Sequence, residues 1–141
     1  MSMRKIRRIA IHHSASKDTR GLQFIGIRRW HKEGRNFSTI GYQFVIENVD
    51  GEPVIIKGRL STRRGAHAKG ANFDSIGICL VGRDKFSPAV IRRLRALVDE
   101  QRAIYGIPRN KVFGHQEVGT TVTECPGDTL MRWVKRYRKT S

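Results

Sequence analysis

Short runs of hydrophobic and β-branched residues, bounded by turn-forming residues, predict β-strands along the chain. Two of these runs, Tyr42–Glu47 and Pro53–Ile56, are joined across an Asp-Gly pair at positions 50 and 51, which favours a hairpin turn. The other predicted strands are Lys5–Ile11, Ile76–Val81 and Lys111–Phe113.

Apolar residues at helical spacing predict three helices. The clearest begins after the N-cap Ser87 and ends before Gly106, with an apolar stripe of Val90, Ile91, Leu94, Leu97, Val98 and Ile104. A second helix is expected at Leu22 to about Lys32. A final basic helix is expected at Asp128 to about Arg138, with Leu130, Met131, Val134 and Tyr137 on one side. Strands with helices between them predict an α/β fold, a mixed central β-sheet flanked by helices in three layers.

The length of 141 residues predicts a single domain covering residues 1–141. The 28 Lys and Arg residues exceed the 12 Asp and Glu residues and give a formal net charge of +16. Such a charge favours polyanionic partners, among them nucleic acid, anionic lipid and acidic cell-wall polymers. No apolar run is long enough to span a bilayer.

The basic N-terminal residues lead directly into His12 without the hydrophobic segment of a signal peptide, so we expect no signal peptide. One disulfide between the two cysteines, Cys79 and Cys125, is an open alternative, although a chain made in a reducing cytosol keeps them as thiols. Two cysteines also exclude a disulfide-rich scaffold and a four-cysteine metal site.

Chemistry-bearing residues gather at predicted strand ends. The pair His12-His13 ends the first strand, His115 ends the last one, and Cys125 lies in the loop just beyond. Two imidazoles and one thiolate suit zinc and leave its fourth position open for a water molecule, as in zinc hydrolases. Alternatively, the histidines are structural or surface residues and the cysteine a small core residue.

A second metal pattern is weaker. His115-Gln116-Glu117 matches the H-x-E element of zinc nucleobase deaminases, whose substrates a basic protein could hold. That site needs a downstream P-C-x-x-C element, but the chain has only Cys125, which follows Glu124. The number of available ligands therefore argues against a deaminase.

A series of motifs resembles the type-2 N-acetylmuramoyl-L-alanine amidases, which share the fold of the peptidoglycan-recognition proteins. The resemblance covers about Ile9 to Trp133, with the motifs in the order found in the family. They are Ile9–Ser16, Arg28–Lys32, Ile40–Ile46, Gly65–Asn72, Ser75–Gly82, Gly114–Val118 and Glu124–Gly127.

The resemblance implies a zinc-dependent hydrolase that cleaves the amide bond between N-acetylmuramic acid and the L-alanine of the peptidoglycan stem peptide. It implies His12, His115 and Cys125 as the Zn²⁺ ligands, Tyr42 as a catalytic residue beside the metal, and His67 and Asn72 as substrate-binding residues. Neighbours in a strand point to opposite faces, so His13 is not expected to share the metal with His12. Cys79 is interpreted as a core residue.

One position departs from the phage-type members of the family. They carry a catalytic lysine two residues before the zinc cysteine, where this chain has Thr123. The family's animal amidases resemble this chain in having threonine there. A threonine hydroxyl can donate a hydrogen bond to a developing oxyanion but lacks the charge of lysine, so we assign Thr123 as a catalytic residue of altered chemistry.

The resemblance also implies partners and location. We expect a monomeric endolysin that is made in the host cytoplasm, acts on peptidoglycan in the periplasm after release, and meets anionic envelope polymers through its basic surface. A phage RNA polymerase is a further partner by family analogy, whereas no stable nucleic-acid complex is expected. Alternatively, the chain is a recognition module without catalysis, which usually shows as loss of the zinc cysteine; here Cys125 is retained. A main function in binding nucleic acid or a polymerase is the other alternative.

Overall fold

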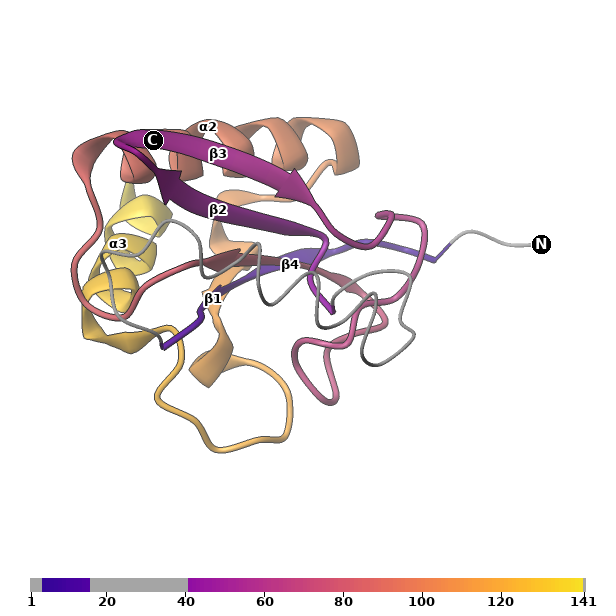
Figure 1. Cartoon of the computed structure of the whole chain (residues 1–141). Helices are drawn as coiled ribbons and strands as arrows, with labels where there is room; N and C mark the ends of the chain where they lie inside the picture. Colours follow the sequence, from indigo (N-terminus) through magenta and orange to yellow (C-terminus); the bar gives the residue numbers. More distant parts are fainter. Residues whose placement is uncertain (1–3, 16–40, 141) are drawn as a thin grey trace, which may run out of the picture.

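The computed structural model describes residues 4–15 and 41–140, which form one five-stranded sheet with two α-helices (Figure 1). The strands lie in the order β3-β2-β4-β1-β5. Strands β2 and β3 are antiparallel, and the other neighbours are parallel, which confirms the predicted mixed sheet. The strand bounds are β1 Arg8–His13, β2 Phe44–Val49, β3 Glu52–Lys57, β4 Ser75–Leu80 and β5 Val112–Gly114.

Strand β1 lies between β4 and β5 and begins and ends later than the sequence predicts. Its pairing with β4 continues to His13 beside Leu80, so both histidines belong to the strand. The predicted strand start at Lys5 is wrong, because the chain enters the sheet only where the Arg7 and Arg8 amides donate to the carbonyl of Asp74.

The predicted hairpin between β2 and β3 is confirmed. Asp50 and Gly51 both have positive φ, 52° and 85°, the combination that a type I′ turn needs. The turn sets the register in which Val49 lies opposite Glu52.

Helix α2 (Pro88–Tyr105) begins and ends as its caps predict. The Ser87 side chain accepts a hydrogen bond from the Val90 amide, and Gly106 closes the helix with a φ of 67°. Helix α3 covers Gly127–Lys139, and two 3-10 turns, η2 (Arg109–Lys111) and η3 (His115–Glu117), flank β5. None of the described helices is long and apolar enough to cross a membrane.

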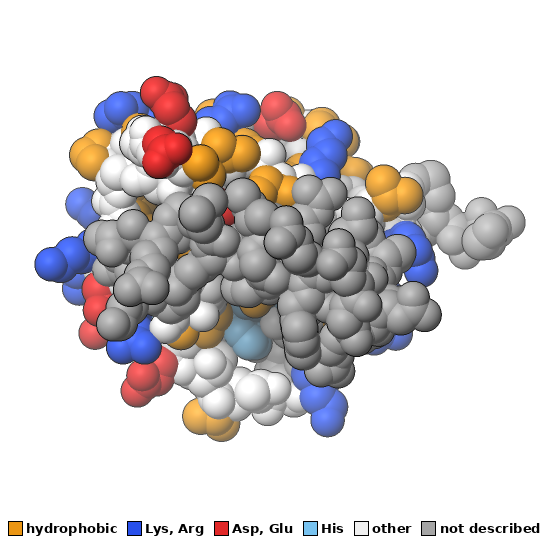
Figure 2. Space-filling model, in the orientation of Figure 1, with side chains coloured by type: hydrophobic (Ala, Val, Ile, Leu, Met, Phe, Trp, Pro, Cys, Tyr) orange, Lys and Arg blue, Asp and Glu red, His pale blue; other side chains and the backbone are white. Residues whose placement is uncertain are grey.

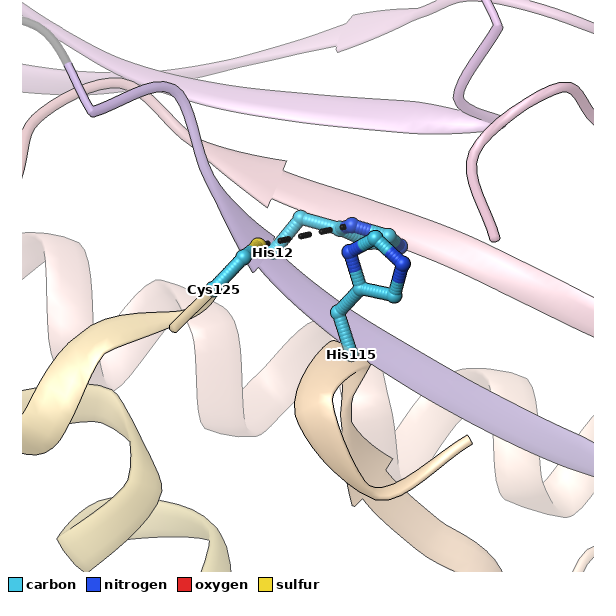
Figure 3. Close-up of side chains that lie close together, drawn as sticks. All are labelled: His12, His115 and Cys125. Carbon is cyan, nitrogen blue, oxygen red and sulfur yellow. Dashed lines mark hydrogen bonds between the residues drawn. The ribbon is translucent and has the colours of Figure 1, made fainter. Parts of the chain in front are cut away.

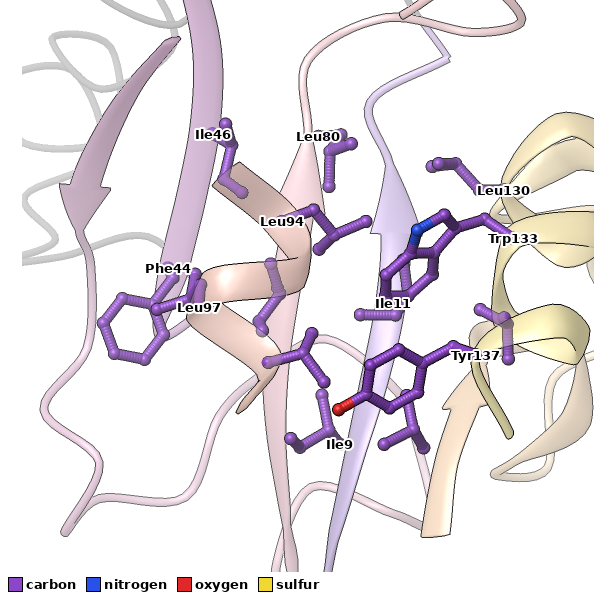
Figure 4. Packing of buried hydrophobic residues seen from close by; sticks show 14 of the residues in the cluster. Ile9, Ile11, Phe44, Ile46, Leu80, Leu94, Leu97, Leu130, Trp133 and Tyr137 are labelled. Atoms are coloured by element: carbon purple, nitrogen blue, oxygen red, sulfur yellow. The ribbon is translucent and has the colours of Figure 1, made fainter. Parts of the chain in front are cut away.

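Both α-helices pack on the same face of the sheet (Figure 4). Helix α2 contributes Leu94 and Leu97, and α3 contributes Leu130, Trp133 and Tyr137, to a core that includes the sheet residues Ile9, Ile11, Phe44, Ile46, Ile76, Ile78 and Leu80. Two side chains differ from the predicted pattern. Ile104 is exposed because it lies near the end of α2, away from the sheet, and Trp133 is buried. The predicted helix Leu22 to Lys32, which would supply a third layer, lies outside the described residues.

The opposite face of the sheet carries polar groups. Strand alternation buries Ile11 in the helix-covered core and turns His12 to the other side. There His12, Gln43 and Cys79 are buried at neighbouring positions on β1, on the segment entering β2, and on β4. This face therefore positions the chemistry of the molecule.

Candidate metal centre and active site

Three potential metal ligands converge from three segments (Figure 3). His12 comes from β1, His115 from the first position of η3, and Cys125 from the loop before α3. One ligand atom from each lies within 4.8 Å of the others, and Cys125 Sγ is 3.6 Å from His12 Nδ1. The structure thus brings together the three residues predicted as zinc ligands.

The local fold fixes these three positions. Ile11 of β1 lies beside Gly114 of β5, which places the two histidines that follow them next to each other. The loop that contains Cys125 is held by a hydrogen bond of 2.8 Å, which the Gln116 amide donates to the carbonyl oxygen of Cys125. Gly114 has no room for a side chain, because a Cβ there would lie 2.2 Å from Met131 Sδ of α3.

Burial keeps the imidazoles in the form that binds metals. Desolvation, reinforced by His67, His115 and His13, lowers the pKa of His12 well below its usual value, and desolvation also lowers the pKa of His115. Both rings are therefore neutral at neutral pH. Burial raises the pKa of the Cys125 thiol to about 11 in the metal-free chain, so binding of a divalent cation as thiolate would release its proton.

The three residues fit zinc by donor type and spacing. Zn–S and Zn–N bonds of about 2.3 Å and 2.0–2.1 Å at a tetrahedral angle separate the two donor atoms by about 3.6 Å. The distance between Cys125 Sγ and His12 Nδ1 is the same, 3.6 Å. Three protein ligands would leave one position open, as catalytic zinc sites do.

The predicted catalytic residues Tyr42 and Thr123 border the same cavity. The Tyr42 ring meets the His12 ring edge-on with centroids 5.1 Å apart, and burial raises the pKa of its hydroxyl. The Thr123 hydroxyl oxygen accepts from the Cys125 amide at 3.1 Å. The cavity has a volume of about 900 Å³ and is lined by His12, His13, Ala15, Tyr42, His67, Arg83, Asp84, His115, Gln116, Thr123, Glu124, Cys125, Gly127 and Asp128.

The two predicted substrate-binding residues have partners within the protein. Asn72 does not line the cavity, and its side-chain oxygen accepts from the His67 and Ala68 amides, both at 2.8 Å. His67 lines the cavity, but its ring nitrogens contact His12 and Ser75. Substrate contact by this pair stays a prediction, and the structure gives each residue another task.

The structure separates the remaining cysteine and histidine from the metal ligands. Cys79 is buried beside Val45 and Tyr42, which confirms its interpretation as a core residue. His13 lies outside the cluster of three ligands, and its carbonyl accepts from the Cys125 thiol at 3.9 Å. Strand alternation thus separates the two neighbouring histidines as expected.

Two further buried polar residues near the site, Ser75 and Gln43, could not be singled out from the sequence. Ser75 is fully buried against His67, and Gln43 joins the Gly77 amide to the carbonyl of Arg63 through its side-chain amide. A buried serine at the start of β4 and a buried glutamine just before β2 carry no local signal of these contacts, which join segments far apart in the chain.

Known proteins resemble this chain in sequence and in fold. The family model for N-acetylmuramoyl-L-alanine amidase matches residues 2–128. The endolysin of Escherichia phage T7 is 38% identical over 133 residues, which cover 89% of this chain and 83% of the relative. The amidase LysC from Clostridium intestinale has a TM-score of 0.75 at 27% identity and covers 97% of this chain and 87% of that chain. Drosophila PGRP-LB has a TM-score of 0.73 at 29% identity, with coverages of 94% and 81%.

The match over most of the length shows that the chain belongs to the N-acetylmuramoyl-L-alanine amidase family, a class of amide hydrolases. Within this family it is an endolysin-type enzyme: besides the T7 protein, the endolysin of Enterobacteria phage K11 is 34% identical over 89% of this chain and 83% of its own length.

Proposed function

We propose that this enzyme is a zinc-dependent endolysin that hydrolyses the amide bond between the lactyl group of N-acetylmuramic acid and the L-alanine of the stem peptide. The observation that carries the proposal is the cluster of His12, His115 and Cys125 at the wall of an open cavity. The chain belongs to the amidase family. Two neutral imidazoles and one cysteine are a ligand set with which a zinc ion can hydrolyse an amide.

The three ligands, all of which line the cavity, would hold Zn²⁺ at its wall. Bound there, zinc would supply Lewis acidity for the scissile carbonyl and lower the pKa of a bound water. The chain itself contributes a rigid frame, because each ligand is fixed by a strand, a 3-10 turn or a hydrogen-bonded loop.

Tyr42 is suited to act as a hydrogen-bond donor at the reaction centre. Its raised pKa keeps the phenol protonated at neutral pH. Its ring packs against His12, which places the side chain beside the metal ligands. We assign it the task of orienting the water or the scissile carbonyl.

Thr123 is suited to stabilise the oxyanion of the tetrahedral intermediate. Its oxygen accepts from the Cys125 amide, which leaves the hydroxyl proton free to be donated. Thr123 also lines the cavity. It would supply at this position a neutral donor in place of the charge of a lysine.

The proposed substrate sets where the enzyme acts. As an endolysin it would cleave peptidoglycan of the host cell wall, in the periplasm after release from the cytoplasm, and the relatives of the endolysin and peptidoglycan-recognition types support this choice of substrate.

Digestion of purified peptidoglycan tests the proposal directly. We expect mass spectrometry to find free stem peptides that begin with L-alanine, glycan chains with intact N-acetylmuramic acid, and one zinc per chain in the purified enzyme. A chelator should stop the release, and zinc should restore it. Cleavage within the glycan or within the peptide, or full activity without metal, would contradict the proposal.

Substitutions of Thr123 test its task. Thr123→Val is expected to lower kcat by about 10²-fold because it removes one donor to the oxyanion. Thr123→Ser should retain activity, and Thr123→Lys should match or exceed the wild type if the cation reaches the same oxygen. Zinc content is measured in parallel because Thr123 also binds the Cys125 amide. Unchanged kcat in Thr123→Val would remove this residue from the mechanism.

The exposed cations of α3 are expected to concentrate the enzyme on anionic envelope polymers. Trp133, Val134 and Tyr137 are buried, so they form an ordinary packing face. Arg138 makes a two-pronged ion pair with Glu117, which leaves Lys135, Arg136 and Lys139, together with Arg132, as the exposed cations. On the face in Figure 2, Lys and Arg side chains are interspersed with Asp, Glu and apolar ones.

Salt dependence distinguishes envelope binding by these cations from simple solvation. We expect lysis of outer-membrane-permeabilised cells to fall steeply between 0.1 M and 1 M salt, as the Debye length shortens from about 10 Å to about 3 Å. Cleavage of a small soluble muropeptide should change little. Replacing Lys135, Arg136 and Lys139 by Gln should reproduce the high-salt result at low salt. As a control, replacing Lys57, Arg92 and Arg93 by Gln should not. Equal salt dependence on both substrates would show that the α3 cations do not bind the enzyme to anionic envelope polymers.

A further inference from the structure

The ring of His67 connects a metal ligand to the interior of the protein. Its Nδ1 lies 2.9 Å from His12 Nε2, and its Nε2 lies 3.2 Å from the hydroxyl oxygen of Ser75. The Ser75 hydroxyl is also 2.6 Å from the carbonyl oxygen of Ala71. All of the side chains in this series are buried.

The carbonyl at the end of the series fixes the direction of every hydrogen bond. The Ala71 oxygen only accepts, so Ser75 donates its single proton there and can only accept from His67. His67 Nε2 therefore carries a proton. The ring is buried and its nitrogens contact only a histidine nitrogen and a serine hydroxyl, with no carboxylate to balance a positive charge, so it is neutral and its Nδ1 is an acceptor. His12 consequently donates from Nε2, which leaves the lone pair of its Nδ1 facing Cys125 Sγ at 3.6 Å.

We propose that Ser75 and His67 are positioning residues that hold His12 in the tautomer with Nδ1 unprotonated, ready to bind zinc. This inference rests on the proposed zinc dependence and gives His67 a task beside, and independent of, contact with substrate. Among the described residues, the buried His115 Nε2 has no hydrogen-bond partner, in contrast to His12 Nε2.

The surroundings hold the His67 ring in this orientation. A Cβ at Gly77 would lie 2.6 Å from His67 Cγ, and one at Gly65 would lie 2.4 Å from His67 Cδ2, so the ring fills a slot that only glycines leave open. The Asn72 side chain fixes the backbone at His67. A ring rotation that exchanged the two nitrogens would therefore need the slot to widen.

The tautomers can be observed directly in the 141-residue chain. Long-range ¹H–¹⁵N spectra of the metal-free and zinc-loaded protein at neutral pH should show Nε2 protonated and Nδ1 unprotonated in both His12 and His67. The opposite tautomer of either ring in the metal-free protein would overturn the proposal. If the wild-type chain bound no zinc, the proposed function would fail, while these spectra would still decide the direction of the hydrogen bonds.

Zinc affinity gives the second measurement, by competition with a chelator. His67→Leu and Ser75→Ala should weaken zinc binding, by about 10- to 100-fold for His67→Leu, because the hydrogen-bond partner of a metal ligand is lost. His67→Gln should recover most of the affinity, since an amide can accept from His12 and donate to Ser75. The matched control Ser87→Ala removes the hydroxyl that caps α2, lowers stability, and should leave zinc affinity unchanged.

The pattern of variants separates the positioning of His12 from a purely structural role and from substrate binding. A structural role alone would make His67→Gln as weak as His67→Leu, and a role in substrate binding alone would raise KM while zinc affinity stayed at the wild-type value. Either pattern would overturn the proposal. If His67→Leu does not fold, the zinc affinity of Ser75→Ala and the spectra of the wild-type protein decide whether Ser75 and His67 position His12.

Discussion

Cys125→Ala is expected to lose zinc and to lower amidase activity by at least about 10³-fold, the factor that corresponds to about 4 kcal/mol of transition-state stabilisation. The reason is the composition of the site: with the thiolate gone, two imidazoles remain, and the loop before α3 no longer reaches the metal position. Zinc content by atomic spectroscopy and release of stem peptides give the two measurements.

His12→Ala and His115→Ala should have the same double effect as Cys125→Ala. Two matched controls come from the same structure. His13→Ala replaces the adjacent histidine, and Cys79→Ala replaces the other cysteine, and both should keep one zinc per chain because neither residue belongs to the cluster. Loss of zinc in His13→Ala alone, or its retention in Cys125→Ala, would show that the ligand set is wrong.

Tyr42→Phe is expected to retain zinc and to lower kcat by about 10²-fold with little change in KM. Only a hydroxyl is removed, so the packing of the ring against His12 persists while one donor at the reacting centre is lost. Steady-state kinetics on a soluble muropeptide measure the effect.

Tyr105→Phe serves as the matched control for Tyr42→Phe. Tyr105 packs at the edge of the helix-covered core, on the face of the sheet away from the metal ligands, and its substitution should leave kcat unchanged. Equal kcat in Tyr42→Phe and the wild type would exclude Tyr42 from the chemistry.

Local patterns are enough to predict most of the described fold. The caps of α2 and the turn at Asp50-Gly51 depend on residues within a few positions of one another, so the sequence displays them directly. The ligand set could be predicted because short motifs resemble those of a family. Such motifs mark residues that are far apart in the chain and meet in the fold. The order of the strands in the sheet, by contrast, has no such local signal.

Contacts between distant segments account for what the sequence does not reveal. Ser75 resembles any residue at the start of a strand, and its contact with His67 forms only when the segment that carries His67 packs against β4. Arg138 resembles the other cations of a basic helix, yet it pairs with Glu117 and binds the carbonyl of Val112. The predicted contact with an RNA polymerase and the monomeric state stay predictions.

The proposed metal centre has a consequence for fragments of the protein. Cys125 and His12, whose side chains touch, are 113 positions apart in the chain, and strand β1, between β4 and β5, contributes the first ligand. A ribosome-bound chain, or a product of proteolysis that has lost either segment, therefore lacks a complete site. Wall-degrading activity would arise only once β1 and the Cys125 loop have come together, so incomplete copies of a cell-lysing enzyme would be harmless to the cell that makes them.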